Sequence, residues 1–289
     1  MNIFKFGFWP SLATAALLLI ILGTTAVLIG KWEFNKQIDS ELERLSANNA
    51  AADINHQKIK EEDLEALPEP VNKWLRNSGI IGKNKISTVN LKQSGKMKLE
   101  PGQEEWFKPE AEQLITLNEP GFLWQVDLNM MPFIKTKGRD LFQNGEASML
   151  IKIAYLLPVV DQKANAKINE SALHRFLLEL PWYPTAALNN YLSWEKIDAT
   201  TARVTMNYQG IQASADFYFD QEGNLLSTEA MRYKESDESA ERLKCTGELK
   251  NYKEFNGIKI PTEIDVSWYL DGEKFTWFKV EVEEISFKY

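Results

Sequence analysis

One uncharged segment near the amino terminus constrains this chain most. Phe8 to Ile29 reads FWPSLATAALLLIILGTTAVLI and holds no charged residue across 22 positions. As a helix it would be about 33 Å long, which is enough to cross a hydrocarbon layer roughly 30 Å thick. We therefore expect a single-pass membrane anchor over residues 1–34, with the rest of the chain in water.

A cleaved signal peptide is the rival interpretation of this segment. Signal peptides have an apolar stretch of only about 7–15 residues, followed by a small-x-small cleavage site, and neither feature is evident here. An uncleaved anchor in the cell membrane is therefore favoured. The flanking charges, Lys5 on one side and Lys31, Lys36 and Arg44 on the other, slightly favour a cytoplasmic domain. The short basic head is nevertheless typical of an export signal, so we expect the globular domain on the extracytoplasmic side.

Charge and cysteine content exclude some classes of partner and bond. The chain carries 41 acidic and 33 basic residues, a net charge of −8, so it offers no broad surface for a polyanion and we expect no nucleic-acid partner. Cys245 is the single cysteine. An intrachain disulfide is therefore excluded, and the redox compartment stays open.

The region after the anchor divides into a polar segment and a long domain. Residues 35–66 are rich in helix formers with a weak apolar trace at Ile38, Leu42 and Leu45, which predicts a solvated, helical stalk. Residues 67–289 are expected to form the globular domain.

The pattern of that domain is mainly that of β-strands. From Ile258 to Leu270 apolar and polar residues alternate, and Asn144-Gly145, Asn256-Gly257 and Asp271-Gly272 are hairpin signals. Residues 169–192 instead follow helical spacing. We predict a mainly β (α+β) fold: a large curved antiparallel sheet or open barrel of about 10–11 strands, covered by this helical insert.

Several segments carry a resemblance. LPEPVNKWLRNSG from Leu67, ALHRFLLELPWYPTAAL from Ala172 and NYKEFNGIKIPTEIDVSW from Asn251 resemble a family of bacterial membrane-associated proteins known only as a domain of unknown function, over residues 67–289. More distantly, FDQEGNL from Phe219 followed by YKEFNGIKIPTEI looks like the outer-membrane lipoprotein carriers, the LolA-like fold. That likeness implies an open barrel whose concave apolar face, lidded by helices, holds acyl chains, and function only by analogy.

Signals for catalysis are sparse. The chain has two histidines, His56 and His174, and lacks HExxH, paired Cys/His, GxSxG and Walker motifs. We expect no metal and no cofactor, and the catalytic residues of any enzyme remain unknown. A hydrolase with an unidentified carboxylate pair stays open, and the carboxylates considered for it are Asp127, Asp140, Asp161 and Glu179.

Two sets of side chains are candidates for ligand binding. Lys135, Lys137 and Arg139 recur at intervals of two, so they share one strand face, which would suit a phosphate or carboxylate head group or serve as an ordinary charged sheet face. The aromatic set could line a cavity or simply form core. Its members are Trp124, Trp182, Tyr183, Trp194, Phe217 and Trp268.

The leading hypothesis combines these features. A large one-sided sheet, an aromatic lid and a membrane tether in one chain favour a non-enzymatic, membrane-anchored binding domain for a lipid or other apolar ligand in the cell envelope. The alternative is an envelope protein-interaction or assembly module with a filled core, whose protein partner the sequence does not identify.

Overall fold

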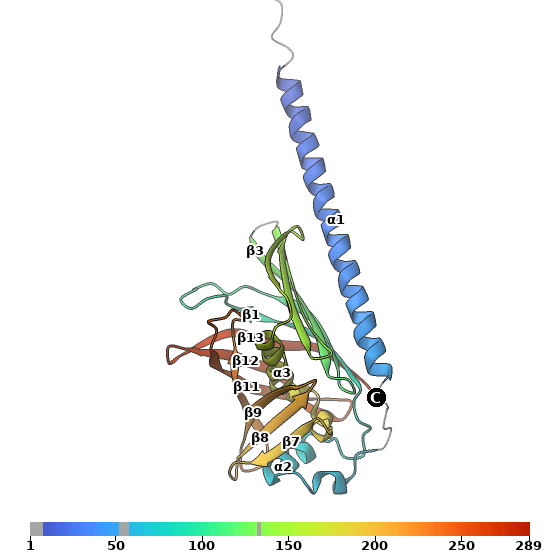
Figure 1. Ribbon diagram of the computed structural model, residues 1–289, viewed down its shortest axis with the longest axis vertical. Helices are drawn as coiled ribbons and strands as arrows, with labels where there is room; N and C mark the ends of the chain where they lie inside the picture. The colour runs from blue at the N-terminus through green and yellow to red at the C-terminus, as the bar shows by residue number, and fades with distance from the viewer. Residues whose placement is uncertain (1–7, 52–57, 132–133) are drawn as a thin grey trace, which may run out of the picture.

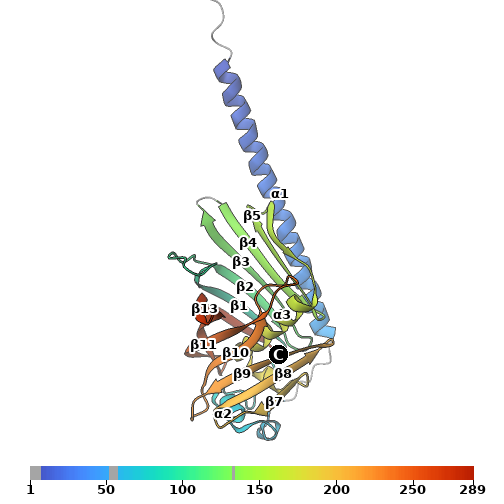
Figure 2. The same ribbon diagram turned by 60° about the vertical axis from the view of Figure 1, so that its left-hand side comes forward.

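A thirteen-stranded antiparallel sheet is the framework of the computed structural model, which describes residues 8–51, 58–131 and 134–289 (Figure 1). Its strand order is β6-β5-β4-β3-β2-β1-β13-β12-β11-β10-β9-β8-β7. The sheet therefore has two meandering arms that join where β1 pairs with β13, and it curls into a half-barrel with β6 and β7 as free edges (Figure 2).

The first arm consists of β1 (Thr88–Met97), β2 (Glu110–Thr116), β3 (Gly121–Met131), β4 (Ile134–Gln143), β5 (Glu146–Ile153) and β6 (Leu157–Gln162). The second consists of β7 (Leu192–Lys196), β8 (Thr201–Tyr208), β9 (Ile211–Phe219), β10 (Leu225–Tyr233), β11 (Arg242–Phe255), β12 (Ile258–Leu270) and β13 (Glu273–Lys288).

The predicted fold class is confirmed, and so are the turn signals. Asn144, Asn256 and Asp271 have φ angles of 54°, 52° and 52°, and each is followed by a glycine with positive φ. This is the backbone that two-residue hairpin turns require, which is why Asn-Gly and Asp-Gly mark them. The sheet has thirteen strands rather than the ten or eleven expected. Its two edge strands are short, with six residues in β6 and five in β7.

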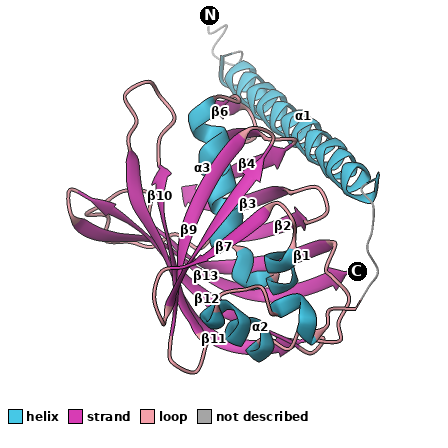
Figure 3. Ribbon diagram, turned by 60° about the horizontal axis from the view of Figure 1, so that its bottom comes forward, coloured by secondary structure: helices cyan, strands magenta, loops and turns pink. Residues whose placement is uncertain are grey.

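The helical insert lies on the concave face of the sheet, as predicted. It comprises α3 (Ala166–Leu178) and two 3-10 turns, η2 (Leu180–Trp182) and η3 (Pro184–Leu188). Asn165 caps α3 by accepting hydrogen bonds from the backbone N–H groups of Lys167 and Ile168. Because α3 contacts β4 and β5 of one arm and β9 and β10 of the other, it bridges the half-barrel (Figure 3).

Two shorter helices close one end of the half-barrel. They are η1 (Glu61–Leu64) and α2 (Glu69–Asn77). Trp74 on α2 packs its ring against those of Trp194, Phe217 and Phe219. This aromatic cluster belongs to the main core.

A long helix, α1 (Phe8–Ala51), runs from the amino-terminal region onto the convex face of the first arm (Figure 1). Within the described part of the chain, it is one helix that is long and apolar enough to cross a membrane. Leu17 to Leu22 are exposed to solvent. The helix continues through residue 34 without a break, so no change of secondary structure marks the expected end of the anchor. The division of the chain at residues 34 and 66 stays a prediction.

The second half of α1 is not the solvated stalk that we expected. A stripe of its residues, including Phe34, Ile38 and Leu45, is buried against Leu123 and Leu150 of the sheet. The weak apolar trace in the sequence was therefore a docking face, because residues three and four apart share one side of a helix.

Candidate functional site

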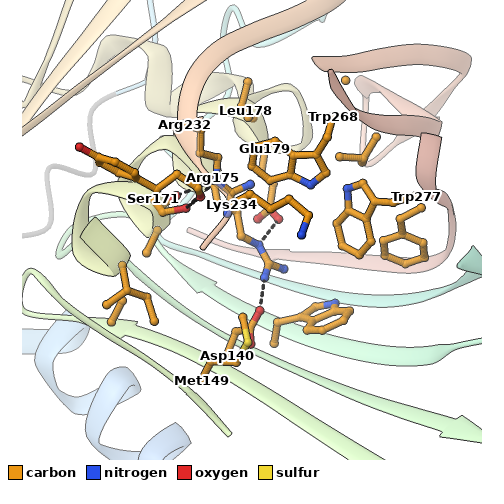
Figure 4. Close-up of a pocket in the computed structure, with 18 of the residues that line it drawn as sticks. Asp140, Met149, Ser171, Arg175, Leu178, Glu179, Arg232, Lys234, Trp268 and Trp277 are labelled. Carbon is orange, nitrogen blue, oxygen red and sulfur yellow. Dashed lines mark hydrogen bonds and ion pairs between the residues drawn. The ribbon is translucent and has the colours of Figure 1, made fainter. Parts of the chain in front are cut away.

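A cavity of about 340 Å³ lies between α3 and the concave face of the sheet (Figure 4). Exposed residues Leu99, Lys234 and Glu235 lie at its rim. Apolar side chains from both arms and from the insert dominate its wall. They include Phe122, Trp124, Ala172, Leu178, Trp182, Ile264, Val266, Trp268, Phe275, Trp277 and Phe278.

A buried ion network crosses this apolar wall. Arg175 of α3 donates to Asp140 Oδ2 on β4 at 2.9 Å through Nη1, and to Glu179 Oε1 at 2.7 Å through Nε (Figure 4). The guanidinium also lies over the rings of Phe122 and Trp124, 4.8 and 5.0 Å from their centroids. One cation therefore serves two carboxylates and two aromatic faces.

Amide side chains extend the network along the sheet. Gln113 Nε2 donates to Glu179 Oε2 at 2.7 Å, and the Trp124 indole N–H donates to Gln93 Oε1 at 2.9 Å. Arg175 and Glu179 meet because they are four residues apart on one helix. The local helical spacing therefore brings Arg175 and Glu179 together, while strands of the sheet supply Asp140 and the two glutamines.

Burial shapes the protonation of this network. It raises the pKa of Asp140, against which Arg175 acts in the opposite direction. Burial alone would lower the pKa of Arg175, but Glu179 and Asp140 outweigh that effect and the net shift is upward. Arg175 is therefore held firmly in its charged form.

A second arginine, Arg232 of β10, lines the same cavity without an acidic partner. Its Nε donates to the backbone oxygen of Ser171 at 3.0 Å and to the Ser171 hydroxyl at 2.9 Å. Its guanidinium lies 5.5 Å from the ring of Trp268. No carboxylate in the described ranges forms an ion pair with it, and burial, its largest influence, lowers the pKa of Arg232. The cavity therefore contains one cation that the protein leaves uncompensated.

The predicted aromatic set divides between this cavity and the core. Trp124, Trp182 and Trp268 line the cavity. Tyr183 is fully buried and donates its hydroxyl to the Phe176 backbone oxygen at 2.6 Å. The remaining two members, Trp194 and Phe217, pack face to edge beside α2. The structure thus brings three of the six residues together at one site.

The predicted cationic strip lies on the convex face, away from the cavity. Lys137 Nζ pairs with Asp127 Oδ2 at 2.9 Å, and Arg139 pairs with Glu41 of α1 at 2.8 Å. Both members of the second pair are buried. Lys135 is exposed. The three residues do share one strand face, but that face carries α1, so a ligand in the cavity cannot contact them.

Of the four candidate carboxylates, Asp140 and Glu179 meet at the cavity through Arg175, whereas the other two lie elsewhere. Asp127 lies on the convex face, and Asp161 is paired with Lys163 near the surface. Cys245 is buried, which raises the pKa of its thiol. His56 lies outside the described residues. Among those that are described, no group of three or more His, Cys, Asp and Glu side chains is arranged to hold a metal ion.

His174 of α3 is buried. Its shifted pKa should make the free energy of unfolding depend on pH. Burial first, and then the charge of Arg232, lowers its pKa to about 4, although Glu170 acts in the opposite direction. Arg242 also faces it and lowers the pKa further. Because the unfolded chain binds the proton more tightly, stability falls as the pH drops from about 6.5 towards 4.

We expect the free energy of unfolding to be about 2 kcal/mol lower near pH 4.5 than near pH 7 on account of His174. Urea denaturation of the full chain and of His174→Gln at both pH values measures this contribution, since other groups titrate equally in the two proteins. Equal pH dependence in the two proteins would contradict the assignment.

The sequence reasoning missed Arg175 and Arg232 as site residues. For Arg175 a signal existed, because it lies four positions before Glu179 and beside the apolar run Phe176 to Leu178. For Arg232 no local signal existed, since its significance comes from the apolar surroundings that the fold creates.

Comparison with protein families gives a match over most of the chain. Residues 65–287 match a family described as a family of unknown function, DUF6920. No curated protein matches the chain.

Proposed function

The chain belongs to the DUF6920 family of unknown function, and we propose that it is a membrane-anchored, non-enzymatic protein that binds a lipid or other apolar ligand in its concave cavity. The observation that carries this proposal is the cavity itself. Protein interiors normally pack without voids larger than a water molecule, whereas ligand sites are apolar cavities of roughly 300–1,000 Å³ with a few polar groups. A volume of about 340 Å³ between sheet and insert falls in that class.

The lining points to an amphiphile, a molecule with an apolar body and one acidic group. Aromatic side chains such as Trp268 and Trp277 would contact the apolar body. The guanidinium of Arg232 would bind a carboxylate or phosphate, because an uncompensated cation in apolar surroundings is costly and an anion removes that cost. Lys234 at the rim is paired with Glu235 at 2.6 Å, so Arg232 is the cation that this proposal assigns to the acidic group.

The long helix supports a location at a membrane. Its uncharged first half is exposed and suits a hydrocarbon layer, while its second half is docked on the sheet. We propose that the domain works within reach of one bilayer, on the extracytoplasmic side of the cell envelope. The distant likeness to lipoprotein carriers is consistent with an acyl-chain ligand, at the level of fold analogy.

The two other hypotheses have less support. An assembly module with a filled core does not explain the cavity. A hydrolase would use the carboxylates nearest the cavity, Asp140 and Glu179, but both accept hydrogen bonds from Arg175, which disfavours their acting as a free acid and base.

Ligand recovery tests the proposal. The full chain, purified in a mild detergent, is extracted with organic solvent, and the extract is analysed by mass spectrometry. In parallel, the protein is titrated with a dansyl-labelled fatty acid. We expect an acidic amphiphile in the extract and saturable dansyl fluorescence. An empty extract together with no probe binding would refute the proposal.

A cavity-filling variant locates the binding. Ala172 lines the cavity on α3, so Ala172→Phe should block probe binding by occupying the space of the ligand. Ala166→Phe places the same side chain at an exposed position of the same helix and should bind like the wild type. Circular dichroism checks that both variants are folded.

A further inference from the structure

The turn between β5 and β6 contacts α1 where the uncharged part of the helix ends. A Cβ atom on Gly30 would lie 2.9 Å from both the Tyr155 backbone oxygen and Leu156 Cδ2, so only glycine allows this approach. Tyr155 also packs edge to face on Phe34, with ring centroids 6.2 Å apart. Because Gly30 directly follows Ile29, the last residue of the apolar run, the turn is held at the level where α1 would leave a bilayer.

Exposed apolar side chains gather at this level. The start of β4 adjoins the turn, because the backbone N–H of Ala154 donates to the oxygen of Lys135 at 2.8 Å. The exposed fractions are 46% for Leu156, 61% for Leu157, 50% for Val159 and 37% for Ile134. We call these four residues the apolar tip. In Figures 1 and 2 the ends of the first-arm strands rise beside α1, on the side of its amino-terminal half.

Unpaired lysines surround the apolar tip. Lys31 of α1, Lys135 of β4 and Lys152 of β5 form no ion pair with any carboxylate in the described ranges, although Lys152 lies 5.7 Å from the ring of Phe34. Farther along the same convex face the cations are paired, as in Lys137 with Asp127. Free lysines around exposed apolar side chains match the boundary layer of a bilayer that contains anionic lipids.

We propose that the apolar tip is a second membrane contact, which enters the headgroup layer of the same bilayer that α1 crosses, with Lys31, Lys135 and Lys152 on anionic lipid. This inference rests on the anchoring by α1 that is part of the proposed function, and it is independent of what the cavity binds. Two contacts on one rigid body would fix the tilt of the domain above the bilayer, which a single helix does not.

Depth-dependent quenching tests the inference on the full chain in vesicles of phosphatidylcholine and phosphatidylglycerol. A cysteine carrying the fluorophore NBD is placed at Leu157 in the apolar tip, at Leu22 in the apolar half of α1, or at Leu226 on β10. Leu226 is an exposed leucine on the strand end beside the Asp220–Asn224 turn, which contacts α2. Because Cys245 is fully buried, the wild-type protein serves as the labelling blank.

We expect lipids that carry a nitroxide on the acyl chain to quench the labels at residues 22 and 157 several-fold more than the label at residue 226. Quenching at 22 but not at 157 would overturn the second contact and leave the anchor intact. No quenching at 22 would overturn the anchoring and this inference with it. Replacing phosphatidylglycerol by phosphatidylcholine should weaken quenching at 157 and leave that at 22 unchanged, and an unchanged signal at 157 would contradict the role of the lysines.

Discussion

Replacing Arg175 by methionine is expected to destabilise the protein by about 3–5 kcal/mol, because it leaves two buried carboxylates without their cation. Asp140 and Glu179 both lose their ion-pair partner, and both side chains are largely buried. The free energy of unfolding, measured by urea denaturation of the full chain in detergent with tryptophan fluorescence as the signal, gives the size of the effect.

The loss should depend on pH in a defined direction. Without Arg175, desolvation is less opposed, so the pKa of Asp140 in the folded state rises further above its ordinary value. A raised folded pKa means that protonation favours the folded state. The variant should therefore be least stable near neutral pH and regain stability as the pH falls.

Two controls separate this effect from a general loss of packing. Arg203→Met removes an arginine whose partner is Asp216 on an exposed sheet face, and should cost no more than about 1 kcal/mol. Adding Asp140→Asn and Glu179→Gln to Arg175→Met removes the uncompensated charges and should restore much of the stability. If Arg175→Met were no worse than Arg203→Met, the network would not hold the site together.

Replacing Arg232 by glutamine is expected to weaken binding of the dansyl fatty acid by about 10- to 150-fold, the equivalent of 1.5–3 kcal/mol for a charge-assisted hydrogen bond. The corresponding dansyl-labelled fatty alcohol carries no charge, and its affinity should change little. Fluorescence titration of both probes against the wild type and the variant gives the two ratios.

Arg242→Gln is the matched control, because Arg242 is paired with Glu170 and half-exposed, and it does not line the cavity. Its affinity for both probes should match that of the wild type. Equal losses for acid and alcohol in Arg232→Gln would indicate a change in cavity shape rather than the loss of an anion contact, and would contradict the assigned role of Arg232.

The fold was readable from the sequence because its determinants are local. Alternation from Ile258 to Leu270 and the Asn256-Gly257 turn specify strand, face and connection within a few residues. The number of strands was less readable, because an edge strand that is mostly exposed, such as β6, leaves little alternation. The docking of α1 was missed because Phe34, Ile38 and Leu45 are too few to distinguish a docked helix from a solvated one.

The cavity was less predictable from the sequence, because its lining depends on which strand and helix faces the fold brings together. The sequence placed Trp124, Trp182 and Trp268 among the cavity candidates, and the structure brings them together. It could not separate them from Phe217, which is also aromatic and lies in an alternating strand, but packs against Trp74 of α2. Likewise, Lys137 and Arg139 had the right charge, but the register of β4 turns them towards α1.

The junction of the two arms bears on how the chain folds. Ser87 donates to the backbone oxygen of Lys288, 201 residues away in sequence, whereas most other strands pair with their immediate successor. The strands of each arm can therefore pair one after another during synthesis. The pairing of β1 with β13 can form only after β13 has been made. Trp124 of β3 and Phe278 of β13 meet across the junction in the cavity wall, with ring centroids 6.4 Å apart. The wall of the cavity therefore stays incomplete until β13 has been made.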